Sequence, residues 1–256
     1  MLLAIDIGNS NTVVGVFDDQ TLLAHFRVTS SLSLTVDEAG LLVSSLFNHH
    51  LKSDAGRVSR VAVCSVVPRL TGIYQQMARL YFKVEPLTIS SKIKLPIGID
   101  YPDPAEIGAD RLANSAAGFA RIKAALVVVD LGTAINFDVV SEKGSYIGGV
   151  IAPGTQTAGA GLAQKAARLF EVRVEKPDHA IGKSTAEGLK SGLYYGTIGM
   201  IDTILERIFA ELGHKTPVVA TGGEAETYCH ATKYVTEIVP TLTLEGIRII
   251  ADYNQK

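Results

Sequence analysis

The fold can be predicted from two similar stretches: AIDIGNSNTVVGVFDD at residues 4–19 and VVDLGTAINFDVVSEKG at residues 128–144. In each, an apolar run typical of a buried strand ends in Asp-x-Gly, a short polar turn follows, and a second apolar strand runs to an acidic turn. The two aspartates, Asp6 and Asp130, lie 124 positions apart, close to half of the 256 residues. A repeat at that spacing indicates an internal duplication.

The elements around the two stretches follow the same succession, strands first and helices after them. The sequence predicts strands at 2–7, 12–17, 22–28, 58–67, 86–89, 125–130, 134–140, 145–151 and 216–221, and helices at 36–47, 68–82, 112–121, 156–169, 185–212, 224–232 and 244–253. Two α/β halves, residues 1–117 and 118–256, are therefore expected to face each other across a central cleft. Ligands favour such interfaces between domains.

Composition excludes several classes of protein. The 24 Lys and Arg residues nearly balance the 26 Asp and Glu residues, and the pI near 6.3 argues against a nucleic-acid-binding protein. No apolar run approaches the ~18 residues that span a membrane, and the first residues lack the basic start of a signal peptide. The two cysteines, Cys64 and Cys229, form neither a disulfide framework nor a metal set. We expect a cytoplasmic protein without a membrane or nucleic-acid partner.

Glycine is the one unusual component, at 24 of 256 residues against a usual ~7%. A glycine allows the backbone to approach a ligand closely or to adopt a positive φ. Several glycines stand next to aspartates or at strand ends, among them Gly8, Gly108 and Gly132. The pair Gly222-Gly223 also follows a strand, where it serves either a close approach to an adenosine or an ordinary strand-to-helix turn.

The two Asp-x-Gly turns have the chemistry of a phosphate site. Residues 8–11 and 132–134 offer backbone N–H groups and short polar side chains, which bind phosphate oxygens. An aspartate at each strand end could hold a cation or its water ligands, as phosphoryl transfer requires. A single turn of this kind is best explained as the closure of a β-hairpin. Two copies half a chain apart favour nucleotide binding.

The stretch from Tyr101 to Arg111, YPDPAEIGADR, is the second candidate site. It places Asp110 and Arg111 just before an Ala-rich helix. Asp110 could act as a general base toward a hydroxyl, and Arg111 could pair with an anionic group of a substrate. The alternative is an aspartate that stabilises the helix start and forms a salt bridge with its neighbour. The residues alone leave both interpretations open.

Two glycine-containing stretches resemble nucleotide-binding motifs but do not match them. Gly182-Lys183-Ser184-Thr185 resembles the end of a Walker A loop, but its first glycine position is Pro177. Ser184 and Glu187 are instead expected to form a capping box, and a ligand contact from Thr185 stays open. The stretch from Gly159 ends in Gln164, so it is not a dinucleotide motif. The small residues 157–161 are expected to allow close helix packing or, as the weaker alternative, to line a substrate site.

Together these motifs resemble the type III pantothenate kinases, a family of the acetate kinase/actin/Hsp70-like superfamily, over essentially the whole chain. The motifs that carry the resemblance are Asp-Ile-Gly-Asn-Ser-Asn-Thr from Asp6, Cys-Ser-Val-Val-Pro at 64–68, Tyr-Pro-x-Pro-x-Glu-x-Gly-Ala-Asp-Arg at 101–111, Asp-Leu-Gly-Thr-Ala at 130–134, Gly-Gly-Val-Ile-Ala-Pro-Gly at 148–154, Gly-Lys-Ser-Thr at 182–185 and Thr-Gly-Gly at 221–223. Gly-Ala-Asp-Arg is specific for the family, whereas Asp-x-Gly marks only the superfamily.

The resemblance implies an α/β protein with the duplicated RNase H-like fold of the actin-like ATPases, two related mixed-sheet halves around a central cleft. It implies phosphorylation of pantothenate by ATP to 4′-phosphopantothenate, the first step of coenzyme A biosynthesis, by in-line phosphoryl transfer. Enzymes of this family are typically homodimers, so the resemblance also implies a homodimer here.

The resemblance also implies roles for residues at matching positions. Asp110 matches the proton acceptor. The expected ATP contacts are Asp6, Ile7, Gly8, Asn9, Ser10, Asn11, Thr12, Val13 and Thr133. The expected pantothenate contacts are Tyr101, Gly108, Ala109, Asp110, Arg111 and Thr185. Asp130 matches the ligand of a monovalent cation, potassium or ammonium, and Asp6 is expected near the magnesium ion that accompanies ATP, directly or through water.

The sequence departs from the family pattern at two places. Ser10 stands where Thr is usual and keeps the hydroxyl, so it changes little. Ile135-Asn136 replaces a more usual Thr-Thr beside the second turn, which removes hydroxyls there and could alter nucleotide affinity or choice.

Three other functions compete with this interpretation. A sugar or acetate kinase shares the phosphate turns but has no need of Gly-Ala-Asp-Arg after Tyr101. A nucleotide-switched protein related to actin or Hsp70 would need inserted subdomains that 256 residues cannot hold. A regulatory accessory factor is the third, because relatives of the family have been named for effects on transcription; the acidic charge balance does not favour direct DNA contact.

Overall fold

The structure, a computed structural model, describes residues 1–52 and 57–255. The chain forms two compact units, Met1–Arg121 with Thr241–Lys256 and Ile122–Pro240. The boundary thus follows residue 121 rather than 117. The expected second half also differs at its end, because helix α7 (Leu242–Tyr253) packs its apolar side on the sheet of the first unit.

Five strands form the sheet of the first unit, in the order β3-β2-β1-β4-β5. Their bounds are Leu2–Ile7 for β1, Asn11–Asp18 for β2, Thr21–Thr29 for β3, Arg60–Ser65 for β4 and Leu87–Thr88 for β5. The first three strands are antiparallel neighbours, and β4 lies parallel to β1 on its other side. The hairpin turn that follows Asp6 therefore joins β1 to β2, as predicted.

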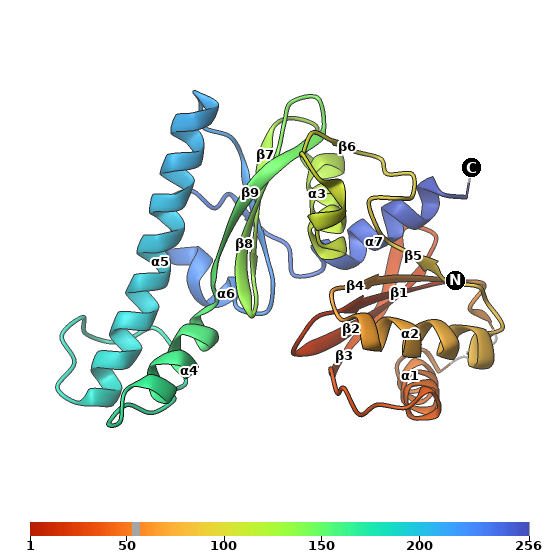
Figure 1. Ribbon diagram of the computed structural model, residues 1–256, viewed down its shortest axis with the longest axis horizontal. Helices are drawn as coiled ribbons and strands as arrows, with labels where there is room; N and C mark the ends of the chain where they lie inside the picture. Colours follow the sequence, from red (N-terminus) through yellow and green to blue (C-terminus); the bar gives the residue numbers. More distant parts are fainter. Residues whose placement is uncertain (53–56, 256) are drawn as a thin grey trace. The chain divides into compact units, whose positions relative to one another are not determined.

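Helices cover both faces of this sheet. Side chains alternate along β1, so Leu3, Ile5 and Ile7 pack with α1 (Val36–Leu51) and α2 (Pro68–Met77), which lie beside the sheet in Figure 1. Leu2, Ala4 and Asp6 face the opposite side, toward α7. Ala4 pairs with Gly15, and there a Cβ on Gly15 would lie 2.9 Å from the Leu244 side chain of α7.

The remaining elements of the first unit connect this sheet to the second candidate site. A π-helical segment, η2 (Ala78–Phe82), extends α2 to the end predicted for that helix. The short strand β6 (Gly98–Ile99) and the 3-10 helix η3 (Pro104–Glu106) then lead into α3 (Ala109–Ile122). Helix α7 packs tightly on α3, since a Cβ on Gly246 would overlap the backbone of Ala113.

The second unit repeats the sheet of the first. Its strands are β7 (Leu126–Leu131), β8 (Ala134–Val140), β9 (Ser145–Pro153), β10 (Val218–Thr221) and β11 (Glu237–Ile238), and β9-β8-β7-β10-β11 is the order in which they pair. Again the first three are antiparallel and β10 is parallel to the first of them. Even the irregularity recurs, since the ladder shifts after Val16 in β2 and after Val139 in β8. The predicted duplication is confirmed.

Helices α4 (Thr155–Lys165), α5 (Thr185–Leu212) and α6 (Ala225–Tyr228), followed by the 3-10 helix η4 (Cys229–Ala231), complete the second unit. The long helix α5, prominent in Figure 1, packs Ile201 and Leu205 against Val127 and Val129 of β7. Asp130 alternates to the other face of that strand. Within the described part of the chain, no helix is long and apolar enough to cross a membrane.

Candidate functional site

The two predicted hairpins are closed in the same way. The Gly8 N–H donates to the Asn11 carbonyl at 3.0 Å, and the Gly132 N–H donates to the Ala134 carbonyl at 3.0 Å. The second turn is one residue shorter, because Ile7 pairs with Thr12 whereas Leu131 pairs with Ile135. The side chains at both tips are exposed, so a ligand can reach them.

The residues of the first hairpin fall into two groups. Asn9, Ser10 and Asn11 are exposed at the tip, and Asp6, Gly8 and Val13 are half-buried beside it. Ile7 and Thr12 are buried. The Thr12 hydroxyl lies 2.9 Å from that of Ser30, whose N–H donates to the Ser10 carbonyl at 3.0 Å. Ile7 and Thr12 thus hold the hairpin in place, and only their backbones are available to a nucleotide.

The two aspartates have different neighbours across the strands. Asp6 is paired with Val13 on β2 and Cys64 on β4. Asp130 is paired with Asn136 on β8 and Thr221 on β10. Paired residues in adjacent strands share a face of the sheet, so Asp130 lies in a row of three oxygen-bearing side chains, the donor type that alkali cations prefer.

Asn136 and Ile135, which depart from the family pattern, occupy different environments. Ile135 is fully buried in the core of the second unit. Asn136 is half-buried and shares the face of Asp130. The change at 135 therefore affects the core, and only the change at 136 adjoins the candidate cation site.

Residues at the start of α4 form hydrogen bonds with the second hairpin. The Thr133 carbonyl accepts the Gly154 N–H at 3.0 Å and the Thr157 hydroxyl at 2.6 Å. A Cβ on Gly154 would lie 2.1 Å from the Gly132 carbonyl oxygen, which explains the glycine at this position. The predicted ATP contact Thr133 is thus fixed through its backbone, and its side chain stays exposed.

The Gly222-Gly223 turn packs against the same hairpin. Gly222 has a φ of 96°, which favours glycine. A Cβ there would lie 2.4 Å from the Leu131 carbonyl oxygen and 2.6 Å from Oδ1 of Asp130. Protein packing alone therefore requires Gly222, and the approach of an adenosine stays a prediction.

Asp110 lies in the first turn of α3, which begins three residues earlier than predicted, at Ala109. Its Oδ1 accepts the Arg111 N–H at 2.8 Å. Burial raises the pKa of this carboxyl above the ordinary value of an aspartate, and the hydrogen bond from Arg111 and its charge oppose the rise by less. The helix-start interpretation holds for the position of Asp110, and the raised pKa suits a proton acceptor near neutral pH.

The other predicted substrate contacts are divided between the units. Tyr101, Gly108 and Arg111 are half-buried and Ala109 is buried, all in the first unit. Gly108 leaves room for the Asp110 carboxylate, whose Oδ1 would lie 2.4 Å from a Cβ at position 108.

Thr185 is exposed in the second unit, at the start of α5. Only half of the capping box predicted there forms. Ser184 accepts the Glu187 N–H at 3.2 Å, but the Glu187 carboxylate accepts the N–H of Lys183, at 2.7 Å, instead of that of Ser184.

Three residues adjoin the second hairpin: Gly154, Thr157 and Glu224. Gly154 and Glu224 were not predicted as site residues, and Thr157 was included only in the weaker alternative that residues 157–161 line a substrate site. Their contacts with the hairpin join segments more than 20 positions apart, which local patterns do not report. The close packing expected for residues 157–161 is found at Gly159, where a Cβ would lie 3.3 Å from the Leu193 side chain. It is not found at Gly161, where a Cβ would have no neighbour within 4 Å among the described residues.

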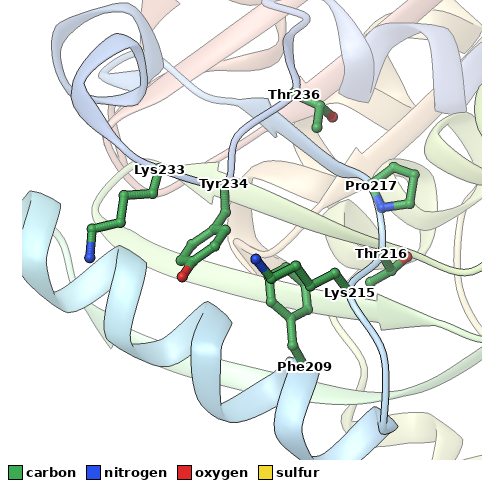
Figure 2. A pocket seen from close by; sticks show the side chains of 7 residues that line it. All are labelled: Phe209, Lys215, Thr216, Pro217, Lys233, Tyr234 and Thr236. Atoms are coloured by element: carbon green, nitrogen blue, oxygen red, sulfur yellow. The ribbon is translucent and has the colours of Figure 1, made fainter.

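A cavity of about 410 Å³ lies elsewhere on the second unit, at the opposite end of β10 from Gly222. Figure 2 shows the rings of Phe209 and Tyr234 and the side chains of Lys215 and Lys233 around it. Its polar groups have partners in the protein: the Lys215 ammonium lies over the Tyr234 ring, and the Lys233 ammonium lies 3.7 Å from Glu206. None of the predicted site residues lines this cavity.

Comparison with known proteins gives matches that span both hairpins and the Asp110 segment. The sequence profile of the family "Type III pantothenate kinase" matches residues 2–207. The type III pantothenate kinase of Myxococcus xanthus is 45% identical over 254 residues, which cover 99% of each chain.

Solved structures support the fold. The chain aligns with an archaeal actin homolog at a TM-score of 0.54 with 10% identity, covering 98% of this chain and 99% of the other. It aligns with the ROK hexokinase of Thermus thermophilus at a TM-score of 0.53 with 13% identity, covering 100% and 99%. These likenesses confirm the duplicated actin-like fold, and the sequence match shows that the chain belongs to the type III pantothenate kinase family.

Proposed function

We propose that this chain transfers the γ-phosphoryl group of ATP to the primary hydroxyl of pantothenate, giving 4′-phosphopantothenate for coenzyme A biosynthesis. The observation that carries the proposal is the family match along nearly the whole chain. It is joined by a half-buried carboxyl of raised pKa at the expected position of the proton acceptor.

In this reaction the substrate hydroxyl oxygen forms a bond to the γ-phosphorus while the bond from that phosphorus to the ADP oxygen breaks in line with it. Asp110 accepts the proton of the hydroxyl, and ADP leaves. General-base assistance of this kind contributes ~10²–10⁴-fold in rate. Positioning of the phosphates and neutralisation of their charge supply most of the rest.

The two hairpins are the proposed ATP-phosphate contacts, with residues 6–13 in the first and Thr133 in the second. Magnesium is usually held by one or two carboxylates together with phosphates and water. Asp6 at the end of β1 fits that pattern. The described residues contain no group of three or more His, Cys, Asp or Glu side chains that could hold a metal. In the proposed reaction the ion would come with ATP and supply charge neutralisation.

For pantothenate, the proposed contacts are Tyr101, Gly108, Ala109, Asp110, Arg111 and Thr185. The Arg111 guanidinium is suited to the substrate carboxylate, because Arg forms charge-assisted hydrogen bonds with such groups.

We assign a monovalent cation, potassium or ammonium, to Asp130, whose neighbours Asn136 and Thr221 add neutral oxygens on the same face. Activity is expected to require potassium or ammonium, and Asp130→Ala is expected to lose this dependence together with most activity. Initial rates measured in potassium, ammonium and sodium buffers of equal ionic strength test this. Full activity of the wild type in sodium alone would contradict the assignment.

The function itself is tested by measuring ADP release with pantothenate, and with acetate and glucose as controls. We expect ADP release above background with pantothenate only, and a product with the mass of 4′-phosphopantothenate. Turnover of acetate or glucose instead would favour the small-acid or sugar kinase, and ATP hydrolysis without any acceptor would favour a nucleotide-switched protein.

We further propose that the protein acts as a homodimer. Large apolar side chains are exposed on β9, α4, α5 and the segment between these helices in the second unit: Val150, Ile151, Leu162, Phe170, Ile181 and Tyr195. We propose that a second copy of the chain covers these side chains. Light scattering at assay concentration measures the mass of the protein in solution and so tests for the dimer. We place the reaction in the cytoplasm, the source of its ATP, and the buried thiols of Cys64 and Cys229 suit a reducing compartment.

A further inference from the structure

Glu224 follows the Gly222-Gly223 turn, and its backbone is tied to the second hairpin. The Glu224 N–H donates to the Leu131 carbonyl at 3.2 Å. The same carbonyl oxygen lies 2.4 Å from where a Cβ of Gly222 would be. The main chain at 222–224 therefore lies against the residue between Asp130 and Gly132.

The Glu224 side chain is half-buried and contacts the start of α4. Burial raises the pKa of its carboxyl, while Thr155 and Gln156, the first two residues of α4, lower it by donating to it. Oxygen Oε2 is buried and has no hydrogen-bond partner among the described residues. Thr155, which contacts this carboxylate, is itself buried at 1% exposure, and its hydroxyl lies 3.0 Å from the hydroxyl of Thr197.

Burying a carboxylate oxygen without a hydrogen-bond partner costs free energy. The contacts of the Glu224 carboxylate connect it to the second hairpin through the start of α4. The start of α4 supplies both donors to the Thr133 carbonyl, the Gly154 N–H at 3.0 Å and the Thr157 hydroxyl at 2.6 Å. Glu224 thus contacts the hairpin through its backbone and, through its side chain, the helix end that binds the same hairpin.

We propose that Glu224 is a positioning residue for ATP: its carboxylate fixes the start of α4, and the start of α4 fixes Thr133 in the second phosphate hairpin. This inference rests on the proposed kinase function for its kinetic consequence, although ATP binding can be measured without turnover.

Glu224→Ala is expected to raise the KM for ATP and the Kd for magnesium-ATP by about tenfold, the equivalent of ~1.4 kcal/mol. The KM for pantothenate should stay within about twofold, because these contacts of Glu224 lead to the second hairpin and the start of α4, which are proposed to position ATP. Glu224→Gln, which keeps the shape and one acceptor oxygen, should restore most of the ATP affinity. Steady-state kinetics and isothermal titration calorimetry measure these quantities.

Thr157→Val tests the second step of the chain of contacts, because it removes only the hydroxyl on the Thr133 carbonyl. It should raise the KM for ATP in the same direction. The double variant with Glu224→Ala should be less than additive, since both changes release the same carbonyl.

Glu226→Ala is the matched control. Glu226 lies two residues further on, is 65% exposed in its side chain and pairs with His230 at 2.8 Å on the surface. It should leave both KM values unchanged.

Unchanged ATP affinity in both Glu224→Ala and Thr157→Val would overturn the inference. So would equal increases in both KM values accompanied by a lowered melting temperature, which would indicate a structural role alone. If Glu224→Ala does not fold, Glu224→Gln and Thr157→Val decide. A wild type that binds ATP without pantothenate-dependent turnover would refute the proposed function, and the calorimetric comparison would still test Glu224.

Discussion

Asp110→Asn is expected to lower kcat by at least ~100-fold, within the range of a lost general base, while the Kd for magnesium-ATP stays near that of the wild type. The amide keeps the acceptor oxygen that receives the Arg111 N–H at 2.8 Å but cannot accept the substrate proton. Single-turnover kinetics and calorimetry measure the two quantities.

The pH dependence of this variant gives a second readout. Burial raises the pKa of the Asp110 carboxyl, so wild-type kcat/KM should fall on the acid side at a pH above the ordinary range of an aspartate. In Asp110→Asn this limb should be absent. Asp18→Asn, exposed at the other end of β2 from the hairpin, should behave as the wild type. Near-normal turnover of Asp110→Asn would remove Asp110 from the role.

Stability should move in the opposite direction from activity. A carboxyl with a raised pKa binds its proton more tightly in the folded than in the unfolded state. Its contribution to stability is present below the unfolded pKa and is lost as the pH rises through the folded pKa. At pH 7 the wild type therefore carries a cost that Asp110→Asn relieves, and the variant should melt no lower than the wild type.

Gly154→Ala is expected to lower both the stability of the protein and its affinity for ATP. Its Cβ would lie 2.1 Å from the Gly132 carbonyl oxygen and 2.6 Å from that of Thr133. Neither backbone atom can move without opening the second hairpin. Overpacking of this kind costs ~1–3 kcal/mol, or about 2–4 °C in melting temperature per kcal/mol for a protein of this size. The KM for ATP should rise at the same time, by at least about tenfold, because Thr133 loses its support.

Gly161→Ala in the same helix is the matched control, since its Cβ would have no neighbour within 4 Å among the described residues. An exposed helical Gly→Ala change favours the helix by up to ~1 kcal/mol. The control should therefore melt at the same or a higher temperature and keep its KM for ATP. Differential scanning calorimetry and steady-state kinetics compare the pair, and equal behaviour of both variants would contradict the packing explanation.

Long periodic elements were predictable because their signal is local. Helix α5 has the expected bounds, Thr185–Leu212, and strand β8 the expected bounds, Ala134–Val140. The two-residue strands β6 and β11 and the single-turn η3 were not predicted, because segments so short contain no period to detect. Helix α7 was predicted as a helix but assigned to the wrong half, since a helix pattern shows which face is apolar and does not show which sheet that face covers.

The features of the candidate site also fall into those that local sequence patterns predict and those that depend on tertiary contacts. The duplication, the two Asp-x-Gly hairpins and the family could be predicted from the sequence, because all three depend on residues close together in the chain or on motifs repeated along it. Three features became visible only in the folded chain: Gly154, Gly222 and Glu224 converge on the second hairpin, Asn136 and Thr221 flank Asp130, and Asp110 is buried enough to raise its pKa. These contacts join segments far apart in the chain, and strand register and helix packing set them.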